Sequence, residues 1–150
     1  MNERLKNSIE VLQRAYLEET LDAGNCEACA VGNLVAASSY EGRSYDWRFV
    51  FCTTDGEQVI YDFQSPWSEE ADESYRKGLD AIKATGYSVE ELARIEYAFE
   101  TSLSDTDEIM MPVHESQWVR LQAVLKVLFE IEGIEYDEEV EQPFLEKALS

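Results

Sequence analysis

Positive charge is scarce in this sequence. Its 150 residues hold only 12 Lys and Arg against 32 Asp and Glu, which gives a formal net charge of −20 at pH 7. A surface field of that sign repels phosphate backbones and anionic lipid headgroups. We therefore expect no direct binding to nucleic acid or to membranes. The same field favours a protein partner with a basic surface.

Long apolar runs are absent as well. No stretch approaches the roughly 18 to 20 apolar residues that cross a bilayer, and the polar residues 1–6 contain no signal-peptide core. We therefore expect a cytoplasmic protein. The cysteines number three, and an odd count argues against a secreted disulfide framework and favours reduced thiols.

Common enzyme motifs are missing too. The chain has no Gly-x-x-x-x-Gly-Lys phosphate loop, no Gly-x-Gly-x-x-Gly, no His-Glu-x-x-His and no Gly-x-Ser-x-Gly. His114 is the single histidine, so any histidine-dependent general base would have to be this residue. Carboxylate pairs are too numerous in so acidic a chain to identify one acid–base couple. These absences favour a non-enzymatic protein.

The pattern of apolar residues predicts a mostly helical α+β fold. Hydrophobic residues make up 45% of the chain, which is enough for one core, so we expect a single globular domain over residues 1–150. A spacing of three to four residues predicts about five helices, at 2–22, 25–38, 68–85, 88–101 and 115–132. The last has the most hydrophobic stripe and is the predicted centre of the core. The segment 102–113 is predicted to be a loop.

One β-hairpin is predicted near residues 48–63. Two runs of aromatic and β-branched residues flank Asp55-Gly56, and Asp-Gly favours the type I′ turn of a two-residue hairpin loop. Both faces of the runs carry apolar residues, so we expect the hairpin to dock on the helices. Eight aromatic residues lie between positions 40 and 67. Core packing is the favoured explanation for them, and an exposed patch that binds a partner is the alternative.

The Cys26-x-x-Cys29 pair has three interpretations. At a helix start it would be a redox-active dithiol, because the helix dipole lowers the pKa of a thiol. As a zinc site it would need two more ligands, and Cys52 and His114 would complete a tetrahedral set. In the third interpretation the cysteines are small buried residues of an alanine-rich helix, and we favour this one. A zinc or thiol-redox protein centred on the pair is therefore the alternative function, and zinc is its cofactor.

Two acidic clusters have a local structural explanation. The run 69–73 opens a predicted helix, where negative charge interacts favourably with the helix dipole. Asp105, Asp107 and Glu108 alternate like the ligands of a hard cation, but the glycine and the distal glutamate of an EF-hand loop are missing. Helix capping is the favoured explanation for these three residues.

The carboxyl-terminal acidic cluster has no such explanation. We expect residues 135–150 to form an acidic, loosely packed segment of the domain. Its carboxylates are the predicted partner-binding surface: Glu135, Asp137, Glu138, Glu139 and Glu141.

Two stretches of the chain resemble a family of small uncharacterised proteins from bacteria and their phages. They are residues 24–34 (GNCEACAVGNL) and 85–100 (TGYSVEELARIEYAFE), which together cover under a fifth of the chain. The resemblance implies a mobile-element or accessory origin and supplies no catalytic or binding positions. Our hypothesis is therefore a non-enzymatic protein-interaction module, an accessory protein or inhibitor of a mobile element, that binds a basic protein surface.

Overall fold

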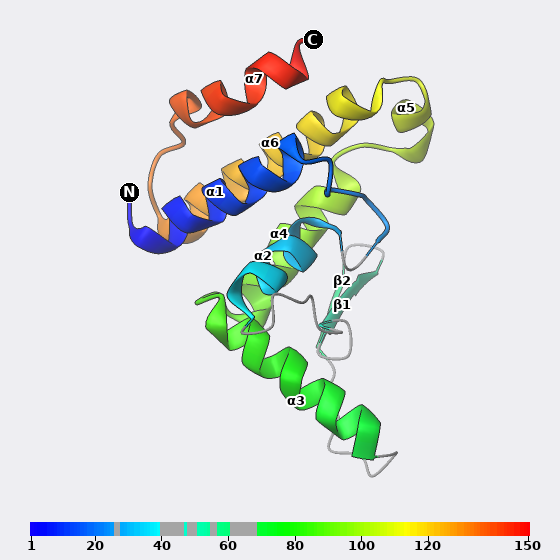
Figure 1. Cartoon of the computed structure of the whole chain (residues 1–150), viewed down its shortest axis with the longest axis vertical. Helices are drawn as coiled ribbons and strands as arrows, with labels where there is room; N and C mark the ends of the chain where they lie inside the picture. The colour runs from blue at the N-terminus through cyan, green and yellow to red at the C-terminus, as the bar shows by residue number, and fades with distance from the viewer. Residues whose placement is uncertain (26–27, 40–46, 48–50, 55–56, 61–68) are drawn as a thin grey trace.

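The fold is built from α-helices. The computed structural model describes residues 1–25, 28–39, 47, 51–54, 57–60 and 69–150. Within these residues α1, α6 and α7 pack against one another, and α4 packs against α6 and α2 (Figure 1). None of the described helices is long and apolar enough to cross a membrane. The helices are α1 (Glu3–Leu17), α2 (Ala30–Ser38), α3 (Glu69–Ala84), α4 (Val89–Thr101), α5 (Asp105–Ile109), α6 (Val113–Glu132) and α7 (Gln142–Ala148).

The predicted α+β fold class is wrong. The described part of the chain is helical, with seven α-helices in place of about five. Its extended residues are the four-residue segments β1 (Phe51–Thr54) and β2 (Glu57–Ile60), which run antiparallel with Phe51 opposite Ile60. Two such short strands do not form a layer of a domain, so helix packing determines the class. Residues 48–50, 55–56 and 61–63 lie outside the described residues, and a docked hairpin over 48–63 is therefore not shown.

The first helix ends earlier than its apolar stripe predicted. Asn2 caps its start, because the Asn2 side-chain oxygen accepts a hydrogen bond from the backbone N–H of Leu5 at 2.8 Å. At the other end Glu19 adopts a left-handed φ of 61°, and the N–H of Thr20 donates to the carbonyl of Ala15 at 2.9 Å. The chain leaves the helical path at this turn, so α1 ends at Leu17 and not near residue 22 as predicted.

A capping box starts α4, at the residue where the sequence predicted the helix to begin. The Ser88 hydroxyl accepts a hydrogen bond from the N–H of Glu91 at 3.0 Å, and the Glu91 carboxylate accepts one from the N–H of Ser88 at 2.8 Å. Two backbone donors at the helix end are thereby satisfied. The position of α4 against α6 is then set by buried apolar residues.

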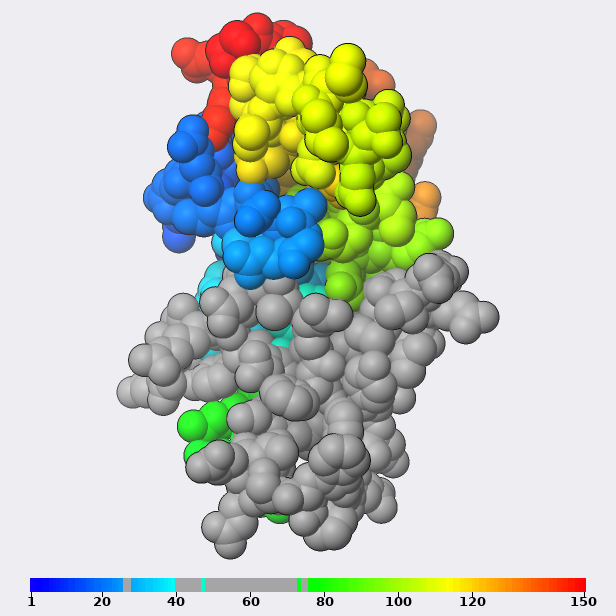
Figure 2. All heavy atoms as spheres, turned by 90° about the vertical axis from the view of Figure 1, so that its right-hand side faces the viewer, coloured from blue at the N-terminus to red at the C-terminus, as the bar shows by residue number. Residues whose placement is uncertain are grey.

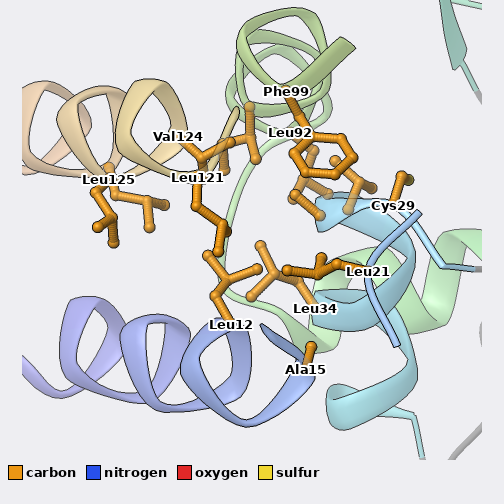
Figure 3. Packing of buried hydrophobic residues seen from close by; sticks show 14 of the residues in the cluster. Leu12, Ala15, Leu21, Cys29, Leu34, Leu92, Phe99, Leu121, Val124 and Leu125 are labelled. Carbon is orange, nitrogen blue, oxygen red and sulfur yellow. The ribbon is translucent and has the colours of Figure 1, made fainter. Parts of the chain in front are cut away.

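The core lies where α1, α2, α4 and α6 meet. Figure 3 shows α6 side chains such as Leu121 pointing between Leu12 of α1 and Leu92 of α4. The sequence prediction that the helix over 115–132 is central is confirmed, since four residues of its apolar stripe are completely buried, whereas Trp118 is 8% exposed and Ile131 is partly buried. The four completely buried residues are Leu121, Val124, Leu125 and Leu128.

Two short helices lie in segments that were predicted as a loop and as a loosely packed segment. The segment 102–113, predicted as a loop, contains α5, whose N-cap Ser104 accepts a hydrogen bond from the N–H of Asp107 at 3.1 Å. In the last segment α7 buries Phe144 completely. The Phe144 ring lies 5.3 Å from that of Trp118 and 5.9 Å from that of Tyr16, between centroids. The carboxyl-terminal segment thus combines exposed carboxylates with a helix that is anchored in the core.

Candidate functional site

Of the Cys26-x-x-Cys29 pair the structure describes Cys29, and Cys26 lies outside the described residues. Cys29 is 1% exposed and serves as the N-cap of α2, whose start was predicted at residue 25. Its Sγ accepts a hydrogen bond from the N–H of Gly32 at 3.3 Å. Asn25 instead closes the preceding turn, because its carbonyl accepts from the N–H of Cys29 at 2.8 Å. Figure 3 shows Cys29 in the same cluster as Phe99.

The surroundings of Cys29 disfavour thiol chemistry. Burial raises the pKa of the Cys29 thiol to about 12, and the nearby charges of Glu96 and Glu100 add to the rise. The hydrogen bond from Gly32 opposes this effect without cancelling it. Because the thiolate is the nucleophile and the metal ligand, a thiol that stays protonated at neutral pH is inert. These surroundings fit the interpretation of Cys29 as a buried core residue.

The other predicted zinc ligands lie on different elements. His114 belongs to the first turn of α6, and its Nε2 lies 3.0 Å from the carbonyl oxygen of Ser150. Cys52 belongs to β1, and its side chain is outside the description. Among the described residues no group of three or more His, Cys, Asp or Glu side chains is arranged to hold a metal ion. The zinc set of Cys26, Cys29, Cys52 and His114 therefore stays a prediction.

The acidic trio Asp105, Asp107 and Glu108 lies in the first turn of α5. Negative charge in this position is stabilising, because it faces the positive end of the helix dipole. Glu108 also lies 3.4 Å from the guanidinium of Arg120. The trio thus has a role in helix formation, as the capping interpretation predicted.

Arg120 is a structural residue that the sequence analysis missed. It lies in the middle of α6 and is only 2% exposed. Its Nη1 donates to the carbonyls of Phe99 at 2.7 Å and Glu100 at 2.8 Å, and its Nη2 donates to Leu103 at 3.3 Å. Together with the Glu108 contact, these bonds tie the end of α4 to α5. The signal that could have identified it was a cation between the apolar residues Trp118, Leu121 and Val124 of the most apolar helix.

The acidic stretch, which we define as Glu135, Asp137, Glu138, Glu139 and Glu141, surrounds the 3-10 helix η2 (Glu138–Glu141). Asp137 is the N-cap of this turn, since its Oδ1 accepts from the N–H of Glu139 at 3.0 Å. Glu141 is half-buried and accepts from the hydroxyl of Tyr136 at 2.5 Å and from Gln122 at 3.3 Å. These two carboxylates therefore hold the turn in place.

The other three carboxylates of the stretch face solvent. Glu135, Glu138 and Glu139 are exposed, and within the described part of the chain they form no ion pair and no side-chain hydrogen bond.

Burial raises the pKa of Tyr136, and the hydrogen bond to Glu141 raises it further. The Tyr136 phenol therefore stays protonated and keeps donating to Glu141 at neutral pH.

A groove of about 430 Å³ lies between α1, α2 and the connection from α3 to α4. Two cations, Arg4 and Arg14, line this groove, and Arg4 is already bound to protein groups. The Arg4 Nε donates to Glu132 at 2.7 Å, its Nη1 donates to the carbonyl of Gly86 at 2.6 Å, and the guanidinium lies over the Tyr87 ring. Because Arg4 is neutralised by Glu132, it gives the groove little attraction for an anionic ligand.

The aromatic residues between positions 40 and 67 are described at one side chain only. Trp47 is buried in the core cluster. The side chains of the other seven lie outside the described residues, so an exposed aromatic patch is neither shown nor excluded. They are Tyr40, Tyr45, Phe49, Phe51, Tyr61, Phe63 and Trp67.

No protein-family model, no curated protein and no solved structure matches this chain. The resemblance of residues 24–34 and 85–100 to bacterial and phage proteins is therefore untested and stays a prediction.

Proposed function

We propose that this protein is a non-enzymatic interaction module that binds a basic surface of another protein through its acidic stretch. The observation that carries the proposal is a group of three exposed carboxylates, Glu138 and Glu139 on the turn η2 and Glu135 in the connection just before it. Exposed carboxylates without internal partners keep their full charge available to Lys and Arg of a partner. The proposal includes a role as a cytoplasmic accessory protein or inhibitor of a mobile element.

The turn that carries these carboxylates is anchored to the core. The Tyr136 ring packs edge-on against Phe129, with 5.2 Å between centroids, and the Tyr136 hydroxyl donates to Glu141. Phe129 is itself buried in α6. A binding surface that is ordered before the partner arrives loses less conformational entropy on association. The anchoring thus supports binding by a preformed surface.

The net charge of the whole chain acts in the same direction. With −20 charges, the protein attracts a basic partner over distances that exceed a single contact. Electrostatic attraction of this kind raises association rates and falls with ionic strength. Salt dependence is therefore the property to measure.

The test is capture of partners from a bacterial lysate on the immobilised protein across a series of salt concentrations. The Debye length shrinks from about 10 Å at 0.1 M to about 3 Å at 1 M ionic strength. We expect captured partners to be basic and to dissociate within this range. Partners that stay bound at every salt concentration would contradict the electrostatic proposal.

The alternative is a zinc or thiol-redox protein centred on Cys26 and Cys29. It receives less support, because burial keeps the Cys29 thiol protonated. Elemental analysis of the purified protein, together with alkylation of its thiols before and after unfolding in urea, tests it. Stoichiometric zinc, or rapid alkylation of Cys29 in the folded protein, would revive this alternative.

A further inference from the structure

The most exposed large apolar side chains of the described residues gather at one end of the molecule. Ile109 is 83% exposed, Met110 81%, Leu149 79% and Val113 69%. They belong to the end of α5, the first turn of α6 and the residue after α7. Figures 1 and 2 show these three places at the same end, with α5 and the start of α6 beside the carboxyl terminus. We call these four residues the apolar corner.

The apolar corner sits on ordered backbone. The contact of Glu108 with the buried Arg120 holds α5, and Ser104 caps its first turn. On the other side, the ring of His114, next to Val113, lies 3.0 Å from the carbonyl oxygen of Ser150. Single exposed apolar residues are ordinary on protein surfaces, whereas several gathered on a fixed patch mark a contact site.

The exposed charged side chains of α5 and of the first turn of α6 are acidic. No Lys or Arg occurs between Arg94 and Arg120, and Arg120 is buried. Asp105, Asp107 and Glu115 are exposed on α5 and α6. The nearest cation on α7, Lys147, is directed to the Tyr16 carbonyl, to which its Nζ donates at 2.6 Å. The apolar corner therefore has an acidic rim.

An acidic rim around an apolar centre selects its occupant. A second copy of this chain would bring like charges together, which disfavours self-association through the corner. A segment with apolar side chains flanked by Lys and Arg matches both the centre and the rim. In such interfaces buried apolar anchors supply most of the affinity, and the charges set orientation and association rate.

We propose that the apolar corner docks an amphipathic, Lys/Arg-rich segment of a partner protein, which inserts its apolar side chains over Ile109 and Met110. This inference rests on the proposed function, because it takes the partner to be a basic protein. It adds a second contact surface, distinct from the acidic stretch around η2.

The probe is a fluorescent synthetic peptide of about 14 residues, with Leu at helical spacing on one face and Lys elsewhere. We expect it to bind the wild-type protein by fluorescence anisotropy. The double variant Ile109→Ser, Met110→Ser is expected to bind about tenfold more weakly or worse, since two apolar anchors are lost. Leu17→Ser is the matched control, because Leu17 is also an exposed apolar residue beside two glutamates, Glu18 and Glu19. Both variants change exposed side chains, and unchanged thermal unfolding verifies their folding.

Equal affinity of the double variant and the wild type would overturn the inference. Equal binding of a peptide with Glu in place of Lys would also overturn it. The same holds if the wild-type protein sediments as a dimer and the double variant sediments as a monomer. Substitution of Glu135, Glu138 and Glu139 by Gln separates the two proposals. If this triple variant still binds the peptide, the corner is supported even when lysate capture through the acidic stretch fails.

Discussion

Arg120 shows how one side chain joins three parts of the fold. Its guanidinium is 2% exposed and is the partner of three backbone carbonyls and of Glu108. We expect Arg120→Met to lower the free energy of unfolding by about 2–4 kcal/mol, because these groups lose their buried partner. Urea unfolding followed by circular dichroism measures this change. Arg120→Lys is the control: it keeps the charge but lacks the planar fork, so only part of the stability is expected to return. A change below about 0.5 kcal/mol for the methionine variant would refute this role.

A buried thiol and a buried phenol make the stability of the fold decrease at high pH. Burial raises the pKa of the Cys29 thiol from 9.0 to about 12 and that of the Tyr16 phenol from 10.0 to about 12. Between these values the unfolded chain releases protons that the folded chain retains, so the free energy of unfolding falls as the pH rises above about 9. We expect the midpoint of thermal unfolding to decline from about pH 9 to about pH 11, and to decline less in Cys29→Ala. A midpoint that is independent of pH over this range would be evidence against the burial of both groups.

At the scale of elements, the long helices were predictable from the sequence because each carries an apolar stripe. The stripe of α6 and the Ser88–Glu91 capping box of α4 are examples. The short helices were not predictable in this way. α5 spans five residues, too few for a periodic pattern to repeat, and α7 has a single fully buried anchor, Phe144. The β-hairpin prediction relied on local turn chemistry, which cannot reveal that helices make up the layers of the fold.

The anchor of α7 is expected to be essential for its docking. Phe144 is completely buried between Tyr16 and Trp118. We expect Phe144→Ala to cost about 3–5 kcal/mol of stability, because it removes a ring from a packed aromatic cluster. Thermal unfolding measures the cost, and amide hydrogen exchange locates it in α7. The matched variant Leu149→Ala changes an exposed residue just beyond the same helix and is expected to be neutral. If both variants are equally stable, α7 does not depend on this anchor.

At the scale of the whole molecule, the sequence predicted the acidic surface better than it predicted which residues are in contact. The exposure of Glu135, Glu138 and Glu139 agrees with the predicted acidic surface, whereas Asp137 and Glu141 turn out to hold the turn itself. The apolar corner was not foreseen. Its residues Ile109 and Met110 have no spacing that distinguishes an exposed side chain from a buried one, because exposure depends on which elements pack over them. Sequence patterns record hydrophobicity and not the tertiary neighbours that remove it from water.

The central claim is that a local acidic surface, rather than total charge, selects the partner. Two triple variants with the same net charge separate these explanations. Each changes three exposed glutamates to glutamine and thus moves the net charge from −20 to −17: Glu135, Glu138 and Glu139 in one, and Glu3, Glu10 and Glu18 of the α1 region in the other. The measurement is quantitative mass spectrometry of proteins captured from lysate by each variant and by the wild type. We expect the first variant to lose the basic partners and the second to retain them. Equal loss in both variants would show that total charge alone governs binding, and it would contradict the account.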